Sequence, residues 1–209
     1  SFIRSAEDVK QIRKVLAENG GEDIKIISKI ESQEGIDNFD EIVKISDGIM
    51  IARGDLGVEV PLEEVPLVQK KIIKLCNKYG KIVITATQML ESMTSNPRPT
   101  RAEVSDVANA IFDITGAIML SGESAMGNYP VVCVETMSKI AHSTEKAISY
   151  DKRFARRNMD FENVDYKLYL DYSICTAANQ MKAKAIFAYT EKGKTPQMFS
   201  SLLPTSPVI

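Results

Sequence analysis

Charged and hydroxyl side chains follow directly on short apolar runs at four points of the sequence. The first run, residues 24–31, ends on Lys29 and Glu31. Alternate side chains of a strand share a face, so these two lie side by side while Ile30 points the other way. An isolated pair of this kind is most simply an internal salt bridge. The pattern recurs, however, which favours an active site, because later runs end on Arg53 and Asp55, on Thr87 and Gln88, and on Ser121 and Glu123.

The side chains at these points suit metal-assisted chemistry on an anion. Glu31 and Asp55 are hard oxygen ligands of the kind that Mg²⁺ or Mn²⁺ prefers, and Lys29 can neutralise an oxyanion or a phosphoryl oxygen. Thr87 and Ser121 offer neutral hydroxyls that form hydrogen bonds or relay protons through water. This set fits a phosphorylated or carboxylated substrate that passes through an enolate. It does not fit hydride or acyl transfer.

Two further observations narrow the chemistry. The glycines of segment 53–57, RGDLG, let backbone N–H groups approach an anion closely. The only histidine, His142, falls in a charged helical stretch and is expected at the surface. Both a zinc site built on histidine and a serine-histidine-aspartate triad are therefore disfavoured.

The composition is that of an ordinary globular protein. Of the 209 residues, 44% are hydrophobic and 26% are charged, and the net charge of −2 gives no reason to expect nucleic acid or an anionic membrane as partner. No apolar run approaches membrane-spanning length. Cys76, Cys133 and Cys175 are widely spaced and odd in number, which predicts neither a disulfide framework nor a zinc site. A reducing cytoplasm is the expected location.

Strand-like and helix-like patterns alternate at spacings of about 25 to 35 residues, which predicts βαβ units and a parallel sheet. The expected strands are almost wholly apolar, as in sheets covered on both faces. Polar groups at their carboxyl ends correspond to the active-site end of a TIM barrel. We expect strands over 24–31, 48–52, 82–86 and 117–120, the end of another at 1–4, and helices over 6–19, 36–45, 65–79, 102–112 and 131–148.

The pattern changes after Tyr150. Residues 151–167 are charged and lack periodicity, so we expect a linker there. A helix over 169–181, a strand over 185–189 and a helix from Pro196 predict the start of a second α/β domain. The expected division is therefore 1–149 and 150–209. Because the chain lacks an initial methionine and ends on a strand-like segment, we interpret it as a piece of a longer protein.

Five segments together resemble the landmarks of pyruvate kinase, in the order of that family. The segment IISKIESQEGI at 26–36 resembles its active-site signature, and ARGDLG at 52–57, TATQML at 85–90, RPTRAE at 98–103 and LSGE at 120–123 resemble the others. The agreement runs from Ser1 to about Ile148 and more loosely to Ile209. The resemblance implies a partial TIM (β/α)8 barrel, about strands 4 to 8, followed by a truncated regulatory α/β domain.

That resemblance implies phosphoryl transfer from phosphoenolpyruvate to ADP in glycolysis, giving pyruvate and ATP, with Mg²⁺ or Mn²⁺ and K⁺. It also implies a homotetramer in which Arg101 lies near a subunit contact. The first three barrel strands, the lid domain, most K⁺ ligands and much of the nucleotide site of the family lie upstream of this segment. We therefore expect the isolated chain to be inactive.

Roles for individual residues follow from the same resemblance. Lys29 stabilises the transferring phosphoryl group and the enolate, and the metal ion is held by Glu31 and Asp55. Thr87, with Ser121 acting through water, is the candidate for protonating the enolate. The implied substrate-binding residues are Lys29, Arg53, Gly54, Asp55 and Thr87.

The resemblance also implies an effector-phosphate loop in the second expected domain. Its residues are Thr190, Gly193, Lys194 and Thr195, at the start of an expected helix, where phosphate binding is favoured. The carboxylate of Glu191 opposes an anion and weighs against sugar-phosphate binding. Two alternatives stay open at this point, a metal-dependent enolate lyase or aldolase on a TIM barrel and a non-enzymatic scaffold fragment.

Overall fold

The computed structural model describes residues 1–155 and 166–209, which form two compact units, Ser1–Ala147 and Ile148–Ile209. Most of the linker expected at 151–167 lies outside the described residues. The part that is described before the gap forms a short helix, α9 (Tyr150–Ala155), rather than an extended linker. No helix among the described residues has the length and apolar character needed to cross a bilayer.

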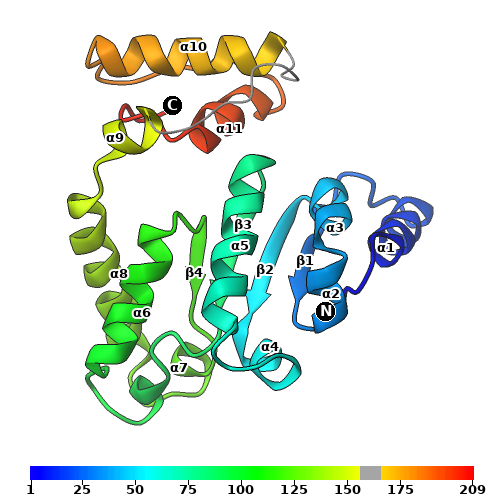
Figure 1. Ribbon diagram of the computed structural model, residues 1–209, viewed down its shortest axis with the longest axis vertical. Coiled ribbons are helices and arrows are strands. Elements are labelled where there is room, and N and C mark those ends of the chain that lie inside the picture. Colours follow the sequence, from blue (N-terminus) through cyan, green and yellow to red (C-terminus); the bar gives the residue numbers. More distant parts are fainter. Residues whose placement is uncertain (156–165) are drawn as a thin grey trace. The chain divides into compact units, whose positions relative to one another are not determined.

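The first unit is built on a parallel sheet. Its strands are β1 (Ile27–Ile30), β2 (Gly48–Ala52), β3 (Ile82–Ala86) and β4 (Ala117–Met119), and they lie side by side in chain order (Figure 1). All three neighbouring pairs are parallel, which confirms the predicted sheet. Their carboxyl ends therefore share one edge, where the polar residues of the sequence analysis emerge.

The prediction of a strand at residues 1–4 is wrong. Phe2 has a φ of 57°, outside the extended region, and no strand is assigned to this segment. Its backbone N–H donates instead to Oε1 of Glu31, at 2.5 Å, while the side chain of Ile3 is buried. A carboxylate, rather than a neighbouring strand, thus holds this segment against the sheet.

The two faces of the sheet differ in burial. In the register of the strands Lys29 pairs with Met50 and Met50 with Ile84, so these three residues form one row, and all are only half-buried. The alternating residues on the other face, such as Ile49 and Val83, are fully buried. The apolar strands predict cover on both faces, but in the described chain only one face is fully covered, because the helices that pack on the sheet shield that face alone.

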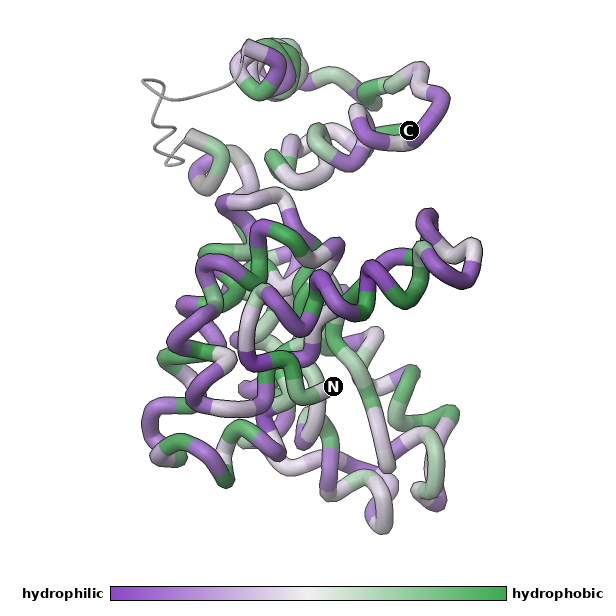
Figure 2. The backbone as a smooth tube through the Cα atoms, turned by 90° about the vertical axis from the view of Figure 1, so that its right-hand side faces the viewer, coloured by the Kyte–Doolittle hydropathy of each residue, from purple (hydrophilic) through white to green (hydrophobic). Residues whose placement is uncertain are grey.

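The helices of the first unit mostly follow the predicted ranges. The expected helix over 36–45 is divided at Asn38, and segment 53–57, expected as a turn, opens a short helix. Hydrophobic and hydrophilic residues alternate along the helices, as amphipathic packing requires (Figure 2). The helices are α1 (Ala6–Glu18), α2 (Gln33–Asp37), α3 (Phe39–Ile45), α4 (Arg53–Glu59), α5 (Val65–Lys78), α6 (Arg101–Phe112), α7 (Gly122–Ala125) and α8 (Pro130–Ala147), with a 3₁₀ turn η1 (Glu91–Thr94).

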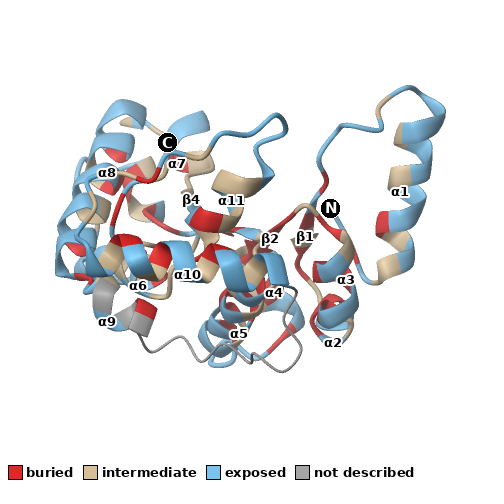
Figure 3. Ribbon diagram, turned by 90° about the horizontal axis from the view of Figure 1, so that it is seen from above, coloured by how far each residue is buried: buried red, intermediate tan, exposed pale blue. Residues whose placement is uncertain are grey.

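Buried residues concentrate in the strands and on the inner sides of the helices (Figure 3). Helix α5 packs against β2 and β3, and α6 packs against α8. Three hydrophobic clusters result, two in the first unit and one in the second, and each contains one cysteine: Cys76, Cys133 and Cys175 respectively. All three carry thiols and none forms a disulfide, as predicted. Burial raises the pKa of Cys76 to about 12, so this thiol is protonated at neutral pH.

The second unit contains α10 (Tyr166–Gln180) and α11 (Lys194–Ser201). The strand expected at 185–189 is reduced to one parallel bridge between Ile186 and Val208. Backbone hydrogen bonds from Ala188 N to Ile209 O, at 2.9 Å, and from Ile209 N to Ile186 O, at 2.8 Å, extend this pairing. The expected helix at Pro196 begins two residues earlier, at Lys194, since proline is tolerated in a first helical turn.

Glu103 secures the amino end of α6, and its hydrogen bonds lead to one prediction about stability. Its carboxylate accepts hydrogen bonds from N and Oγ1 of Thr100 and from N and Oγ of Ser92. Burial raises the pKa of Glu103, but these hydrogen bonds outweigh it and lower the pKa below 4.5. The carboxylate therefore stabilises the fold fully above the unfolded-state pKa, and the stabilisation is lost as pH falls through the lower folded-state pKa.

We expect Glu103→Gln to lower the free energy of unfolding by about 1 to 3 kcal/mol at pH 7, as for hydrogen bonds to a charged group. The difference from the unmodified chain should shrink as pH falls below 4.5. The measurement is urea unfolding of dilute chain followed by circular dichroism. Glu91→Gln, at an exposed carboxylate of η1, is the matched control. A loss that is the same at pH 7 and pH 3 contradicts the prediction.

Candidate active site

The predicted lysine and two carboxylates come together at the carboxyl ends of β1 and β2. Nζ of Lys29 contacts Oε2 of Glu31 and lies 3.1 Å from Oδ2 of Asp55. The Glu31 side chain is 3% exposed and that of Asp55 is 61% exposed, so the ammonium lies between a buried carboxylate and an open one. This places all three residues as the sequence analysis expects.

These contacts keep Lys29 charged. Its close contact with Glu31 is the largest cause of a raised pKa, and Asp55 adds to the effect, whereas partial burial lowers the pKa by less. The lysine is therefore protonated throughout the neutral range. It presents a positive charge where two strand ends meet, as required for neutralising an oxyanion.

Glu31 uses one oxygen for a backbone hydrogen bond and the other for its contact with Lys29. Oε1 accepts the hydrogen bond from Phe2 N, whereas Oε2 is buried and makes no hydrogen bond in the described chain beyond its ion pair with Lys29. A buried carboxylate oxygen needs a positively charged partner to offset its loss of water. The donor that the structure does supply, the lysine, is itself a cation.

The pair of carboxylates fits a magnesium site. Each carries an oxygen beside the same Lys29 nitrogen, so both carboxylates face one region at the strand ends. No group of three or more histidine, cysteine, aspartate or glutamate side chains suited to a metal ion occurs in the described residues. Mg²⁺ needs no such group, because it usually binds one or two carboxylates together with water and substrate phosphate.

Helix α4 brings the exit of β2 to the exit of β3. The backbone N–H of Gly54 donates to Oγ1 of Thr87 at 2.8 Å, which joins two predicted site residues directly. The side chain of Arg53 is only 9% exposed and its guanidinium donates to the carbonyls of Ala86 and Thr87. The Arg53 guanidinium is therefore engaged by groups of the protein itself.

Ser121 lies at the exit of β4, one residue before α7, and is half-buried. Its backbone N–H donates to Oε2 of Glu123 at 2.8 Å. Glu123 is fully buried, and its other oxygen accepts a hydrogen bond from Leu90 N at 3.1 Å. The carboxylate thus ties the loop after β3 to the loop after β4, a role that its sequence position does not reveal.

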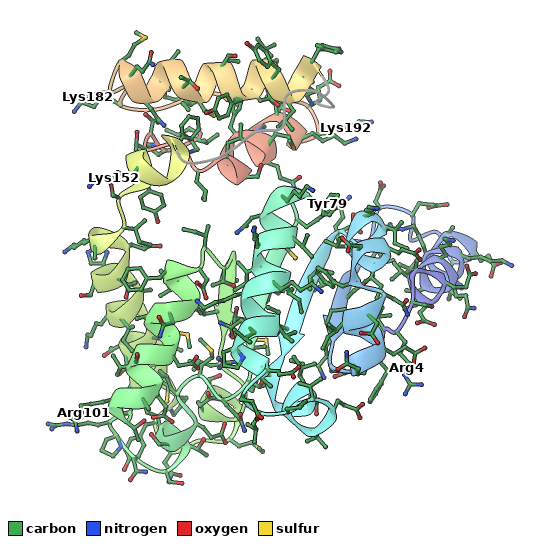
Figure 4. All side chains as sticks on the ribbon, in the orientation of Figure 1. Arg4, Tyr79, Arg101, Lys152, Lys182 and Lys192 are labelled. Carbon is green, nitrogen blue, oxygen red and sulfur yellow. The ribbon has the colours of Figure 1, made fainter. Side chains whose placement is uncertain are left out.

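Two other predicted features lie away from the sheet edge. Arg101 is the first residue of α6 and extends outward from it, exposed (Figure 4). In the second unit, Thr190, Gly193 and Lys194 are exposed, and Thr195 is half-buried at the start of α11. Gly193 has a φ of 70°, and its N–H donates to Oγ1 of Thr190 at 3.1 Å.

Comparison with known proteins identifies the family. Residues 1–134 match the model of the pyruvate kinase barrel domain. The whole chain aligns with pyruvate kinases of Clostridium acetobutylicum, at 59% identity over 209 residues, and Clostridium perfringens, at 55% over 210 residues, and covers 44% of each. A crystal structure of a pyruvate kinase from Cryptosporidium parvum superposes on the whole chain with a TM-score of 0.94 at 42% identity, and 43% of that structure is covered.

The comparisons give no support to a lyase, an aldolase or a scaffold. The chain spans less than half the length of the relatives that it matches. Its parallel strands, with alternating helices on one face, are a segment of a TIM-type barrel. The chain belongs to the pyruvate kinase family.

Proposed function

We propose that this chain supplies the phosphoryl-transfer part of a pyruvate kinase active site, which converts phosphoenolpyruvate and ADP to pyruvate and ATP. The observation that carries the proposal is the Lys29 ammonium between the carboxylates of Glu31 and Asp55, at the carboxyl ends of barrel strands. Charge neutralisation and positioning supply most of the catalysis in phosphoryl transfer, and this arrangement supplies both.

Each charged residue has a distinct role in the proposal. Lys29 neutralises negative charge that develops on the phosphoryl group and on the enolate oxygen. Glu31 and Asp55 hold Mg²⁺ or Mn²⁺, which, when bound, neutralises phosphate charge and orients the substrate. The backbone of Arg53, Gly54 and Asp55 contacts the substrate at the start of α4. The family requirement for K⁺ extends to this protein, with most ligands outside this chain.

Thr87 and Ser121 are the proposed hydroxyls for the proton step. Each lies at the carboxyl end of a strand, and each loop is held by hydrogen bonds that are buried or partly buried. Neither hydroxyl is basic or acidic enough to act alone at neutral pH, so the proton reaches the enolate through water that they orient. Thr87 also contacts the substrate.

Other features of the family follow as part of the proposal. The protein acts as a homotetramer in the cytoplasm, with the exposed Arg101 near a subunit contact. The catalytic barrel ends and the regulatory domain begins near residues 149 and 150, a boundary supported by the division of the described chain after Ala147. Phosphate binding at 190–195 is supported by the exposed start of α11 and opposed by Glu191.

A chimeric enzyme, called the reconstituted enzyme from here on, tests the proposal. Residues 1–209 replace the matching 209-residue segment of the Clostridium acetobutylicum relative, which provides the remaining part of a full-length chain. We expect it to form pyruvate from phosphoenolpyruvate only when ADP and Mg²⁺ are present, in a coupled assay for pyruvate. A folded reconstituted enzyme that forms no pyruvate, while the unmodified relative does, contradicts the proposal.

Metal binding gives a separate prediction. In the reconstituted enzyme Glu31→Gln and Asp55→Asn should each weaken Mn²⁺ binding at least about 10-fold, because each removes one of two charged ligands. Free Mn²⁺ is measured by electron paramagnetic resonance during titration. Glu59→Gln is the matched control, since Glu59 is an exposed carboxylate on the same helix as Asp55. Unchanged Mn²⁺ affinity in Asp55→Asn rules out the assigned ligand pair.

A further inference from the structure

The buried guanidinium of Arg53 connects three separate parts of the first unit. Nε donates to the carbonyl of Ala86 at 3.2 Å, and Nη2 donates to the carbonyl of Thr87 at 2.6 Å. Nη1 pairs with the carboxylate of Asp106, on α6, at 2.7 Å and also donates to Gln69, on α5, at 3.3 Å. Helices α5 and α6 thus hold the Arg53 side chain while it binds Ala86, the last residue of β3, and Thr87, the residue after it.

Thr87 needs such support because of its backbone. Its φ is 66°, and that of the next residue, Gln88, is 54°. A β-branched residue is rarely found in this left-handed region, where any residue other than glycine is strained. Such a conformation persists only where surrounding contacts enforce it.

Two adjacent residues hold Thr87 at two points. Arg53 binds its carbonyl oxygen, and the backbone N–H of Gly54 binds its side-chain Oγ1. The carbonyl contact fixes the peptide plane after Thr87. The hydroxyl accepts from Gly54 N and donates to the carbonyl of Ala86 at 2.6 Å, and Nε of Arg53 binds that same carbonyl. The direction of the Thr87 hydroxyl therefore depends on the position of Arg53.

We infer that Arg53 is a positioning residue that sets the Thr87 hydroxyl for the proton step, and that it does not itself bind the substrate through its side chain. This inference rests on the proposed function. The planar fork of arginine is needed, because a single ammonium nitrogen cannot reach two carbonyls and a carboxylate in one plane. Asp106 orients the guanidinium of Arg53 and therefore contributes to the same positioning of Thr87.

The test uses proton exchange in the reconstituted enzyme. Protonation of the enolate, run in reverse, removes a methyl proton from pyruvate, so deuterium uptake by the methyl group in D₂O reports that step apart from turnover with ADP. We expect Arg53→Lys to slow both deuterium uptake and kcat about 10- to 100-fold, the effect of misplacing a reacting group. KM for phosphoenolpyruvate should change by less than about 3-fold.

A double-mutant cycle separates positioning from general loss of structure. In a Thr87→Ala background the hydroxyl is absent, so Arg53→Lys should slow deuterium uptake by less than about a further 3-fold. Lys70→Met is the matched control. It removes an ion pair between α5 and Asp113, 2.5 Å long, that does not touch Thr87, and it should leave deuterium uptake unchanged.

Two results overturn the inference. One is a folded Arg53→Lys enzyme whose deuterium uptake is within about 2-fold of the unmodified enzyme, and the other is an equal loss with and without the Thr87 hydroxyl. If Arg53→Lys fails to fold, Asp106→Asn decides, with slowed uptake supporting the inference and unchanged uptake overturning it. Absence of activity in the unmodified reconstituted enzyme is a different result and counts against the proposed function.

Discussion

Replacing Lys29 by methionine in the reconstituted enzyme should lower turnover by about 10²- to 10³-fold, as expected when a preorganised oxyanion stabiliser is removed. The methionine keeps most of the length of the side chain and removes the charge between Glu31 and Asp55. KM for phosphoenolpyruvate should change less, because the ammonium matters most when charge develops in the transition state. Steady-state kinetics with phosphoenolpyruvate and ADP measure both quantities.

The matched control is Lys25→Met, which removes the charge of an exposed lysine that precedes the same strand. Its turnover should equal that of the unmodified enzyme. If the Lys29→Met enzyme retains a large part of the turnover, the catalytic role of Lys29 is contradicted. The Lys29–Glu31 contact is then an internal salt bridge.

Replacing Glu123 by alanine should have the largest effect on stability, a loss of about 2 to 5 kcal/mol in the free energy of unfolding. The substitution removes the acceptor of the buried Leu90 N–H and of the partly buried Ser121 N–H, and it opens a cavity where a fully buried side chain was. Urea unfolding of the dilute chain, followed by circular dichroism because the chain has no tryptophan, measures the loss.

Two other variants define the cause. Glu123→Gln keeps the volume and one acceptor oxygen, so its loss should lie between those of the alanine variant and the unmodified chain. Glu135→Gln removes an exposed carboxylate of α8 that pairs only with Lys139, at 3.7 Å, among the ion pairs of the described chain, and should change stability by less than about 0.5 kcal/mol. Equal stability of Glu123→Ala and the control contradicts an anchoring role.

The sequence predicts the sheet and the central contacts of the site well, because both depend on local pattern. The bounds of β2 and β3 are those of the apolar runs, and parallel pairing places their carboxyl ends at one edge. The alternation of side chains along β1 then suffices to predict contact between Lys29 and Glu31. These features need no knowledge of the distant chain.

Features that depend on contacts between distant parts of the chain could not be predicted from the local sequence pattern. Segment 1–4 looks like a strand, but a hydrogen bond from Phe2 to Glu31, 29 residues away, sets its course. Asp106 lies in mid-helix among other polar residues, and no spacing shows that it meets the guanidinium of Arg53, 53 residues away. Glu123 follows a strand as the catalytic candidates do, yet its burial makes it an anchor, which only the folded chain reveals.

The cysteines are distributed so that each one can report when its own hydrophobic cluster becomes exposed during unfolding. Each hydrophobic cluster contains one thiol, Cys76, Cys133 or Cys175. Burial raises the pKa of Cys76 to about 12, so its thiol stays protonated at pH 7 and is expected to be alkylated slowly in the native state. Pulsed alkylation during unfolding, read by mass spectrometry of the three cysteine peptides, should therefore time the exposure of each cluster without any engineered cysteine.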